Sequence, residues 1–539
     1  MTRQAFLRLA AAALAKTASA AEQPRILDPE AFRHHVDFFN GMAPEDVVNA
    51  IPNAQAWEWI KSNAPLFTCP DRDVEQIYFF RWWTYRKHIK QTPEGFIVTE
   101  FLKPVSHAGG YNSLSCALGH HIAEGRWLRD QQFLDQDIHF WLRTGESGGL
   151  RKNLHQFSGW TAFALYDRYL SDGKRDFVAS YLDPLLLDYA AWENERMTGT
   201  GLFWQRDVSD GMEESISGGR KVKNIRPSIN SYMYGNAKAI AAIATLAGKA
   251  QIAREYSEKA ARLRELTLKR HWNKESAFFE TLLETGESAN VREAIGYTPW
   301  YFDLPPDRSG YEAAWKQLMD PSGFSAPYGP TTAERRSPKF EITYTGDDCK
   351  WNGPNWPFAT TITLRALANT LNGYHQSAIT RSDYFQSFLG YVKTHHITQD
   401  DGRVIPWIDE NQNPLTGEWL ARAMKIKKKT FYGRGDYYNH SGFCDLAITG
   451  LAGLRPRADE VVEVNPLIPA DKWDWFCLDR VPYHGRMLAI VWDKTGAKFN
   501  KGKGLRVFAD GKEIAHAREL SRVVGQALPP ANSDQSRDR

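Results

Sequence analysis

Residues 237–268, AKAIAAIATLAGKAQIAREYSEKAARLRELTL, contain two apolar stripes with the period of an α-helix. Ile240 and Ile243 belong to the first stripe, which stops at Gly248, a residue favoured just past a helix C-terminus. The second stripe runs through residues 252–266 and begins only a few positions later. Because so short a link makes consecutive helices antiparallel neighbours, this stretch predicts a helical hairpin.

The helical period is repeated through residues 71–455, where Gly, Pro and Asn interrupt it. A further stripe begins at Phe157, Trp160 and Phe163. The spacing has no fixed-length repeat of the solenoid kind. A closed toroid of helix pairs holds such a length around one core better than an open bundle does. We therefore predict that residues 71–455 form one all-α dominated domain, an (α/α)6 toroid.

The residue pattern changes toward the end of the chain, where it predicts strands. Residues 456–520 contain three short segments rich in β-branched or aromatic residues, with the turn signal Asp510-Gly511 after the last. These segments are residues 461–464, 487–492 and 505–508. We expect a small C-terminal β-appendage there. Residues 22–70 remain as an N-terminal extension, and the polar residues 521–539 predict a disordered tail.

The first residues are typical of a secretory signal peptide. Arg3 and Arg8 precede an alanine and leucine stretch that ends in the small-x-small pattern Ala18-Ser19-Ala20. We expect residues 1–20 to be removed, which places the mature protein in the periplasm or outside the cell. Their three basic residues and lack of acids mean that removal brings the formal charge from +3 to zero. A neutral protein has no electrostatic footprint for nucleic acid, and no later stretch reaches the ~20 apolar residues of a membrane span.

Aromatic residues are unusually frequent, with 19 Trp, 22 Tyr and 28 Phe. Sugar rings pack their C–H faces on aromatic rings, so these residues suit a carbohydrate cleft, although a large aromatic core is the other interpretation. The five cysteines lack CxxC spacing and are too few and too scattered for a disulfide framework. The adjacent His120 and His121 point in different directions on a helix, and no carboxylate completes a ligand set. We expect no metal and no cofactor.

Residues 204–219, WQRDVSDGMEESISGG, form the first segment that can supply catalytic carboxyl groups. Its Gly and Ser content excludes a regular helix, and acids packed this closely raise each other's pKa, as a general acid requires. A solvated acidic loop is equally compatible with the pattern. Asp210, Glu213 and Glu214 are the candidate acids, and Trp204 and Arg206 are candidate substrate contacts beside them.

A second acidic segment, residues 406–419 (PWIDENQNPLTGEW), places Glu410 and Trp407 at a turn shaped by Asn, Pro and Gly. Between the two acidic segments, residues 351–357 read WNGPNWP, and two indoles flank a rigid Gly-Pro turn. Trp351, Gly353 and Trp356 can form the wall of a sugar subsite. In isolation, both segments are also compatible with structural turns.

In this order, the three segments resemble the (α/α)6 inverting enzymes of glycoside hydrolase families 63 and 37, most of all the bacterial mannosylglycerate hydrolase-like branch. The resemblance covers roughly residues 70–455. It implies that Glu213, within Gly-Met-Glu-Glu-Ser, is the general acid, and that Glu410, within Glu-Asn-Gln-Asn-Pro-Leu-Thr-Gly, is the general base. It also implies that the Trp-x-Gly-Pro-x-Trp motif at 351–356 lines the subsite for the non-reducing sugar.

Two departures from the family pattern bear on this assignment. The acid position is Glu where the family usually has Asp, which keeps Asp210 and Glu214 open as the acid. The large N-terminal β-domain common in family 63 is absent, because residues 22–70 are too few to form it.

Two further segments are candidate substrate contacts. Arg81 and Trp82 lie in an aromatic helix where Arg could bind sugar hydroxyls, or where the side chains could pair inside a buried helix. Arg434 and His440 lie in the segment YGRGDYYNH, residues 432–440, which holds every residue type that a polysaccharide lyase uses. A lyase on a helical toroid and a non-catalytic carbohydrate-binding protein are therefore the alternatives.

We expect an exo-acting, inverting glycoside hydrolase with a carbohydrate as its substrate. Glu213 would protonate the leaving oxygen while Glu410 draws a proton from a water molecule on the opposite face of the sugar. Such a mechanism requires the two carboxyl groups to stand roughly 6.5–9.5 Å apart.

Overall fold

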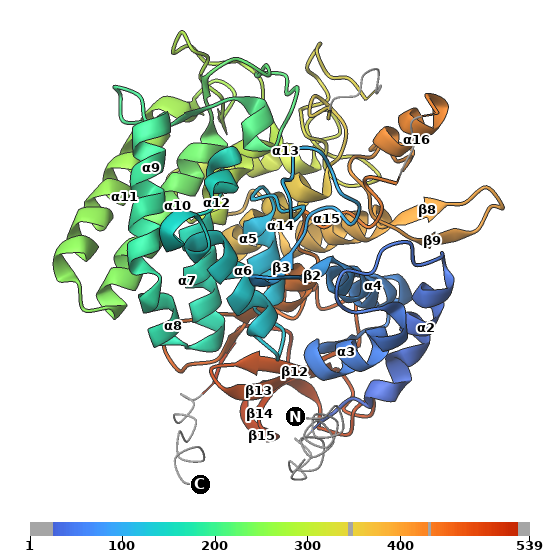
Figure 1. The fold of residues 1–539 in the computed structure, drawn as a ribbon. Helices are drawn as coiled ribbons and strands as arrows, with labels where there is room; N and C mark the ends of the chain where they lie inside the picture. Colours follow the sequence, from blue (N-terminus) through green and yellow to red (C-terminus); the bar gives the residue numbers. More distant parts are fainter. Residues whose placement is uncertain (1–24, 343–348, 430–432, 526–539) are drawn as a thin grey trace, which may run out of the picture.

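The computed structural model describes residues 25–342, 349–429 and 433–525 (Figure 1). The expected signal peptide, residues 1–20, lies outside the described residues. Helices form the framework of the body, and a five-stranded sheet lies at one end of it. Within the described ranges, none of the helices is both long and apolar enough to cross a membrane.

Short links join some consecutive helices of the body, whereas longer segments separate others. The helices are α4 (Arg72–His88), α5 (Leu118–Gly125), α6 (Gln132–Arg143), α7 (Thr161–Asp172), α8 (Arg175–Ser180), α9 (Leu182–Arg196), α10 (Pro227–Leu246), α11 (Ala250–His271), α12 (Thr298–Tyr301), α13 (Lys316–Met319), α14 (Pro357–Gly373), α15 (Arg381–Lys393), α16 (Leu420–Lys427) and α17 (Cys444–Leu446). Short links join α7, α8 and α9, for example, and a longer segment separates α9 from α10. Four two-stranded antiparallel sheets lie between these helices in the described residues: β2 (Ile89–Thr92) with β3 (Gly95–Val98), β4 (Trp204–Gln205) with β5 (Asn224–Ile225), β6 (Trp272–Asn273) with β7 (Phe278–Phe279), and β8 (His396–Thr398) with β9 (Val404–Pro406).

The predicted hairpin of residues 237–268 is confirmed, because α10 and α11 pack along each other. Gly248 lies in the turn between the two helices with a φ of +72°, which residues other than glycine rarely adopt. Helix α10 is buried on nearly every side, whereas α11 buries one stripe that includes Tyr256, Ala260 and Leu263 and exposes the rest. The pair thus forms an inner and an outer layer, and Figure 1 shows α11 at the outer edge of the body.

One helix prediction is wrong at its start. The stripe expected from Phe157 becomes helical only at Thr161, the first residue of α7. Phe157 and the segment up to Trp160 are not helical, and the side chain of Asn236 in α10 accepts the backbone N–H of Phe163 and donates to the carbonyl of Gly159. This tertiary contact holds the segment out of the helix, and Phe157 turns toward the cavity described below.

The C-terminal strands form two antiparallel sheets. The larger has the order β1-β12-β13-β14-β15, and the smaller has the order β10-β11-β16. Their bounds are β1 (Leu66–Thr68), β10 (Leu454–Arg455), β11 (Glu463–Val464), β12 (Trp475–Tyr483), β13 (Arg486–Asp493), β14 (Gly504–Ala509), β15 (Lys512–Ala517) and β16 (Val523–Val524). Asp510 and Gly511, both with positive φ, join β14 to β15 in the predicted turn.

The N-terminal extension is built into both parts of the molecule. Helices α2 (Arg33–Gly41) and α3 (Ala56–Asn63) pack on α4, and β1 pairs with β12 of the C-terminal sheet. Asp479 of β12 also accepts the backbone N–H groups of Ile26 and Leu27 at 2.8 and 2.9 Å. The sheet thus unites the two ends of the chain.

The prediction of a disordered tail is wrong for its first residues, because β16 pairs with β11 and is part of the smaller sheet. Residues 526–539 lie outside the described ranges.

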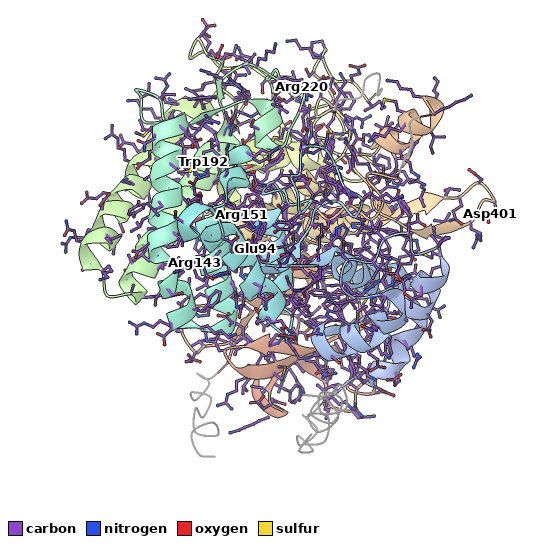
Figure 2. All side chains as sticks on the ribbon, in the orientation of Figure 1. Glu94, Arg143, Arg151, Trp192, Arg220 and Asp401 are labelled. Atoms are coloured by element: carbon purple, nitrogen blue, oxygen red, sulfur yellow. The ribbon has the colours of Figure 1, made fainter. Side chains whose placement is uncertain are left out.

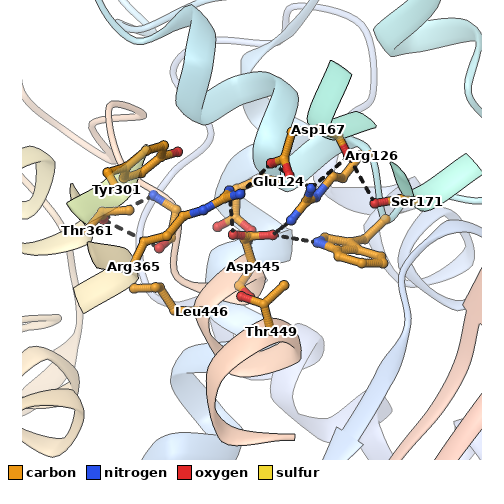
Figure 3. A network of polar contacts seen from close by, with 12 residues as sticks. Glu124, Arg126, Asp167, Ser171, Tyr301, Thr361, Arg365, Asp445, Leu446 and Thr449 are labelled. Atoms are coloured by element: carbon orange, nitrogen blue, oxygen red, sulfur yellow. Dashed lines mark hydrogen bonds and ion pairs between the residues drawn. The ribbon is translucent and has the colours of Figure 1, made fainter. Parts of the chain in front are cut away.

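A buried ion-pair network joins four helices at the centre of the body (Figure 3). Arg126, just after α5, contacts Asp167 of α7 at 2.6 Å and Asp445 of α17 at 2.7 Å. Arg365 of α14 contacts the same two aspartates at 2.6 and 3.4 Å. Two cations face two anions here, so the buried charges compensate one another. We call these four residues the central network.

Candidate active site

A cavity of about 330 Å³ opens into the body. Figure 2 shows Arg220, an exposed residue at its edge, at the end of the molecule opposite the five-stranded sheet. The lining combines carboxyl groups with aromatic rings, as a polyhydroxylated ligand requires. The cavity is lined by Glu100, Phe101, His107, Leu114, Cys116, Gln156, Phe157, Val208, Gly211, Glu213, Arg220, Cys349, Trp351, Trp356, Phe358, Arg434, Tyr438 and His440.

Residues 204–225, the acid loop, form one side of the cavity. Strands β4 (Trp204–Gln205) and β5 (Asn224–Ile225) pair and close the loop at its base. Asp210 is buried and accepts a hydrogen bond from Arg226 at 2.9 Å, which ties the loop to the start of α10. Its pKa is raised by burial, although Arg226 opposes the shift. Asp210 does not line the cavity, so the structure gives it an anchoring position.

Glu213 is the acid of the loop that lines the cavity. The preceding Gly211 has a φ of +75°, and a Cβ there would lie 2.8 Å from the sulfur of Cys116, so only glycine fits the turn. The half-buried Glu213 side chain reaches the cavity, and its desolvation raises its pKa to about 7. Arg220 opposes the rise, while Glu410 and Glu100 add to it.

Glu214 faces a different partner. Its carboxylate forms an ion pair with Lys350, and it is not among the residues that line the cavity. Of the three acids that the sequence left open, Glu213 is thus the one that the structure brings to the cavity.

Residues 349–357, the tryptophan segment, form the next part of the wall. The indoles of Trp351 and Trp356 are stacked with centroids 4.7 Å apart and planes 12° apart. Gly353 fits tightly, because a Cβ there would lie 2.2 Å from the carbonyl oxygen of Glu341. Asn355 exchanges two backbone hydrogen bonds of 3.0 Å with Gln412, which fixes the tryptophan segment against residues 404–420, the base segment.

Glu410 lies in the base segment directly behind the cavity wall. Arg434 donates to its Oε1 at 2.6 Å and Lys425 contacts the same oxygen at 3.3 Å. Its Oε2 lies 3.8 Å from the sulfur of Cys349, which lines the cavity. Burial acts to raise the pKa of Glu410, but Arg434 and Lys425 outweigh it and the pKa is lowered. Glu410 is therefore held as a carboxylate.

Residues 433–440 complete the wall with Arg434, Tyr438 and His440. Arg434 lies over the ring of Phe101, and the ring of Tyr438 lies 3.7 Å from that of His440. The sequence predicted Arg434 and His440 at the site but did not single out Tyr438.

Glu100 is a further cavity residue that the sequence reasoning missed. It follows strand β3, lines the cavity and accepts a hydrogen bond from the hydroxyl of Tyr438. Burial raises its pKa to about 7, with Tyr438 and Arg434 opposing and Glu410 adding to the rise. A single acid two positions after the end of the apolar strand Gly95–Val98 was the available signal, because an acid in such a setting is seldom buried without a reason.

Several predicted substrate contacts lie away from the cavity. Arg81 is buried and donates to Ser441, and Trp82 is fully enclosed in the core, so both serve packing inside α4. Arg206 is exposed outside the lining. Trp204 lies between the cations of Arg196 and Lys223 instead of facing the cavity.

Trp407 lines a separate, more open cavity of about 730 Å³ between the β8–β9 hairpin and α16. Among the described residues, no group of three or more His, Cys, Asp or Glu side chains is arranged to hold a metal ion.

The profile of the mannosylglycerate hydrolase MGH1-like glycoside hydrolase domain matches residues 110–441, which include the acid loop, the tryptophan segment and the base segment. The chain belongs to this glycoside hydrolase family. The resemblance to the mannosylglycerate hydrolase-like branch is therefore confirmed. A second profile, that of the C-terminal domain of glycosyl hydrolase family 65, matches residues 454–516, which hold most of the C-terminal strands.

A solved structure named "Sialidase" is 50% identical to this MGH1-like chain over 93% of its length, with a TM-score of 0.88. The chain spans 45% of that protein. A GH78 family rhamnosidase of Bacillus sp. GL1 is 13% identical, with a TM-score of 0.53 over 83% of this chain and 41% of the rhamnosidase, which shows a shared fold. A GH63 mannosylglycerate hydrolase from Thermus thermophilus is 15% identical, with a TM-score of 0.49 over 69% of this chain and 99% of its own.

Proposed function

We propose that this protein cleaves glycosidic bonds by inversion, with Glu213 as general acid and Glu410 as general base. The observation that carries the proposal is one cavity that joins the Glu213 carboxyl group to the stacked indoles of Trp351 and Trp356 and, through Arg434 and Cys349, to Glu410. Membership of a glycoside hydrolase family gives the reaction class, and a carbohydrate is the substrate class that follows.

The assignment of Glu213 as the acid rests on its place in the cavity and on its proton. A general acid must hold a proton at the working pH and release it to the leaving oxygen. Burial outweighs the opposing charge of Arg220 and keeps the pKa of Glu213 near 7. Asp210 and Glu214 are each paired with a cation elsewhere, which leaves Glu213 as the available donor.

The assignment of Glu410 as the base rests on its charge and on the geometry of its two oxygens. Both cations contact Oε1, and Oε2 is directed to the Cys349 side of the cavity wall. An ionised oxygen on that side can accept a proton from a water molecule that attacks the sugar from the face opposite Glu213. A single displacement by water inverts the anomeric carbon.

The size of the site supports exo-action as part of this proposal. A volume of about 330 Å³ lies at the lower end of the range for ligand pockets, so the cavity suits one terminal sugar unit better than a chain passing through. The inner and outer layers of α10 and α11, together with the fold shared with the rhamnosidase, support an (α/α)6 toroid around this cavity. The signal pattern before Ala20 supports action outside the cytoplasm.

The lyase alternative is weaker in this geometry. A lyase needs a residue such as Tyr438 to abstract a proton, but burial and the neighbouring Glu100 raise the pKa of the Tyr438 phenol well above its usual range. The Arg434 guanidinium, which would neutralise a uronate, already contacts Glu410.

The decisive test is to incubate wild type, Glu213→Gln and Glu410→Gln with a panel of aryl glycosides and oligosaccharides while proton NMR follows the released sugar. We expect wild type alone to release sugar rapidly, with the inverted anomer appearing first. Glu214→Gln is the matched control, because it neutralises the adjacent glutamate, whose partner is Lys350. First appearance of the retained anomer, or full activity of both Gln variants, would refute the proposed mechanism. An unsaturated product that absorbs in the near ultraviolet would establish the lyase.

A further inference from the structure

Three polar groups in the cavity wall are buried without a hydrogen-bond partner among the described residues. They are Oε2 of Glu100, both ring nitrogens of His440 and the indole nitrogen of Trp351. All three side chains are at most 4% exposed and all three line the cavity. We call them the unpaired cluster. Leaving a buried polar group unsatisfied costs about 1–3 kcal/mol, so folding alone does not account for polar residues at these positions.

The unpaired cluster is one continuous surface. Tyr438 connects its members, because its hydroxyl donates to Oε1 of Glu100 and its ring lies 3.7 Å from that of His440. His440 in turn packs edge-on against Trp356 at 5.9 Å, and Trp356 stacks on Trp351. Tyr438 therefore fixes one oxygen of Glu100 and leaves Oε2 as the oxygen without a partner.

The chemistry of the cluster suits hydroxyl groups. Burial lowers the pKa of His440 well below its usual range, so its imidazole is neutral and presents one donor and one acceptor. A carboxyl oxygen beside it can pair with a second hydroxyl. A sugar ring that borders the Trp351 and Trp356 indoles presents neighbouring hydroxyls in this way. Water molecules could also satisfy these polar groups, but they would not select one sugar over another.

We propose that Glu100 and His440 are specificity-determining residues that bind two neighbouring hydroxyls of a neutral sugar ring beside the stacked indoles. The inference deepens the proposed function and rests on it for the identity of the site. Glu100 precedes residues 110–441, over which the family profile matches, so the family assignment does not include it.

The charge of the cavity excludes an acidic sugar at this wall. Glu100, Glu213 and Glu410 surround the site, and Arg434 already contacts Glu410. A uronate or sialic acid carboxylate placed against Glu100 would lie near the ionised Glu410 in a poorly solvated place, and it would oppose ionisation of Glu100 itself. The ring bound here therefore presents hydroxyls, not a carboxylate, to Glu100.

The test measures binding of free monosaccharides, which requires no turnover. Wild type, Glu100→Ala, Glu100→Gln and His440→Ala are titrated calorimetrically with D-glucose, D-mannose, D-galactose, L-rhamnose, D-glucuronic acid and N-acetylneuraminic acid. We expect a neutral sugar to bind most tightly and both Ala variants to weaken it at least tenfold, which is about 1.4 kcal/mol. Glu100→Gln should lose less, because an amide keeps the hydrogen bond.

Monodeoxy derivatives of the tightest neutral sugar then identify the contacts. A sugar lacking the hydroxyl that Glu100 binds should bind wild type weakly and show no further loss with Glu100→Ala. Tyr437→Phe is the matched control for variants of this segment. Tyr437 is the neighbour of Tyr438 but packs against Trp83 and Trp407, away from the cavity.

Three results would overturn the proposal: unchanged affinity in Glu100→Ala and His440→Ala, tightest binding of an acidic sugar, or no saturable binding of any of the six sugars. A protein that binds neutral sugars through Glu100 yet hydrolyses no glycoside would instead reject the proposed function alone. The binding and hydrolysis experiments thus test the two proposals independently.

Discussion

The central network and the cavity both bury carboxyl groups, but the pKa values of these groups shift in opposite directions. In the network, burial acts to raise the pKa of Asp167, yet the adjacent Arg126 and Arg365 lower it overall. In the cavity, burial raises the pKa of Glu100 and of Glu213 to about 7, because the nearby cations are too weakly coupled to either carboxyl group to offset it. Burial alone therefore does not set the charge of these groups; the contacting cation does.

Glu410 lies at the site, but cations contact its carboxylate, as they do in the network. Arg434 and Lys425 contact it and keep it ionised. The cavity region thus holds two carboxyl groups with raised pKa values, Glu100 and Glu213, and one carboxyl group, Glu410, that has lost its proton. Environments that push the pKa values of two carboxyl groups apart in this way are typical of an acid and base pair.

The largest effect is expected when the two catalytic carboxyl groups are neutralised. Glu213→Gln and Glu410→Gln should each lower kcat/KM on an unactivated glycoside about 10²–10⁴-fold. The roles separate with a dinitrophenyl glycoside, whose leaving group needs no proton. Glu213→Gln should recover most of its activity on that substrate, and Glu410→Gln should not. Equal recovery in both variants would contradict the division of roles.

The next largest effect is expected in the central network. Asp445→Ala leaves Arg126 and Arg365 buried with one anion between them and should lower the free energy of unfolding by about 3–5 kcal/mol. Urea denaturation measures the change. Asp401→Ala, at the exposed tip of the β8–β9 hairpin (Figure 2), is the control and should leave the unfolding midpoint unchanged. A loss in Asp401→Ala as large as that in Asp445→Ala would remove the distinction between network and surface.

Neutralising a cavity carboxyl group should instead raise the free energy of unfolding. Glu100 has a pKa of about 7 in the folded protein against 4.5 for the ordinary glutamate, so the folded state holds a proton that the unfolded state has lost. Stability therefore falls as pH rises from about 4.5 to 7. Glu100→Gln removes this cost and should raise the free energy of unfolding by about 1–3 kcal/mol at pH 8 and by little at pH 5. A destabilised variant at pH 8 would show that Glu100 is a structural residue of the network kind.

The smallest expected effect is a shift in the pH dependence of activity. Glu410 must be ionised, so activity is lost as pH falls through its pKa, while loss of the Glu213 proton ends activity above about pH 7. Arg434→Ala should raise the pKa of Glu410 and move the acidic limb of kcat/KM upward by about one pH unit. The alkaline limb should stay near pH 7. An unchanged acidic limb would show that Arg434 does not hold the charge of Glu410.

Features that depend only on neighbouring residues could be predicted from the sequence. The helical period and Gly248 predicted the α10–α11 hairpin, and Asp510-Gly511 predicted the turn between β14 and β15. The order of the three motif segments indicated the glycoside hydrolase family. Periodicity, capping and turn chemistry act over a few residues, so they can be read without knowing what packs against them.

Which polar residues share the cavity depends on the folded chain and could not be predicted from local patterns. Glu100 and Tyr438 are 338 positions apart, and no local pattern links them. Arg81 has the composition of a sugar contact, but its partner Ser441, 360 positions away, places it in the core. The choice of Glu213 over its acidic neighbours likewise depended on Arg226 and Lys350, which pair with the others. Burial and cation contact are long-range properties of the folded chain, and they determine which carboxyl group keeps its proton.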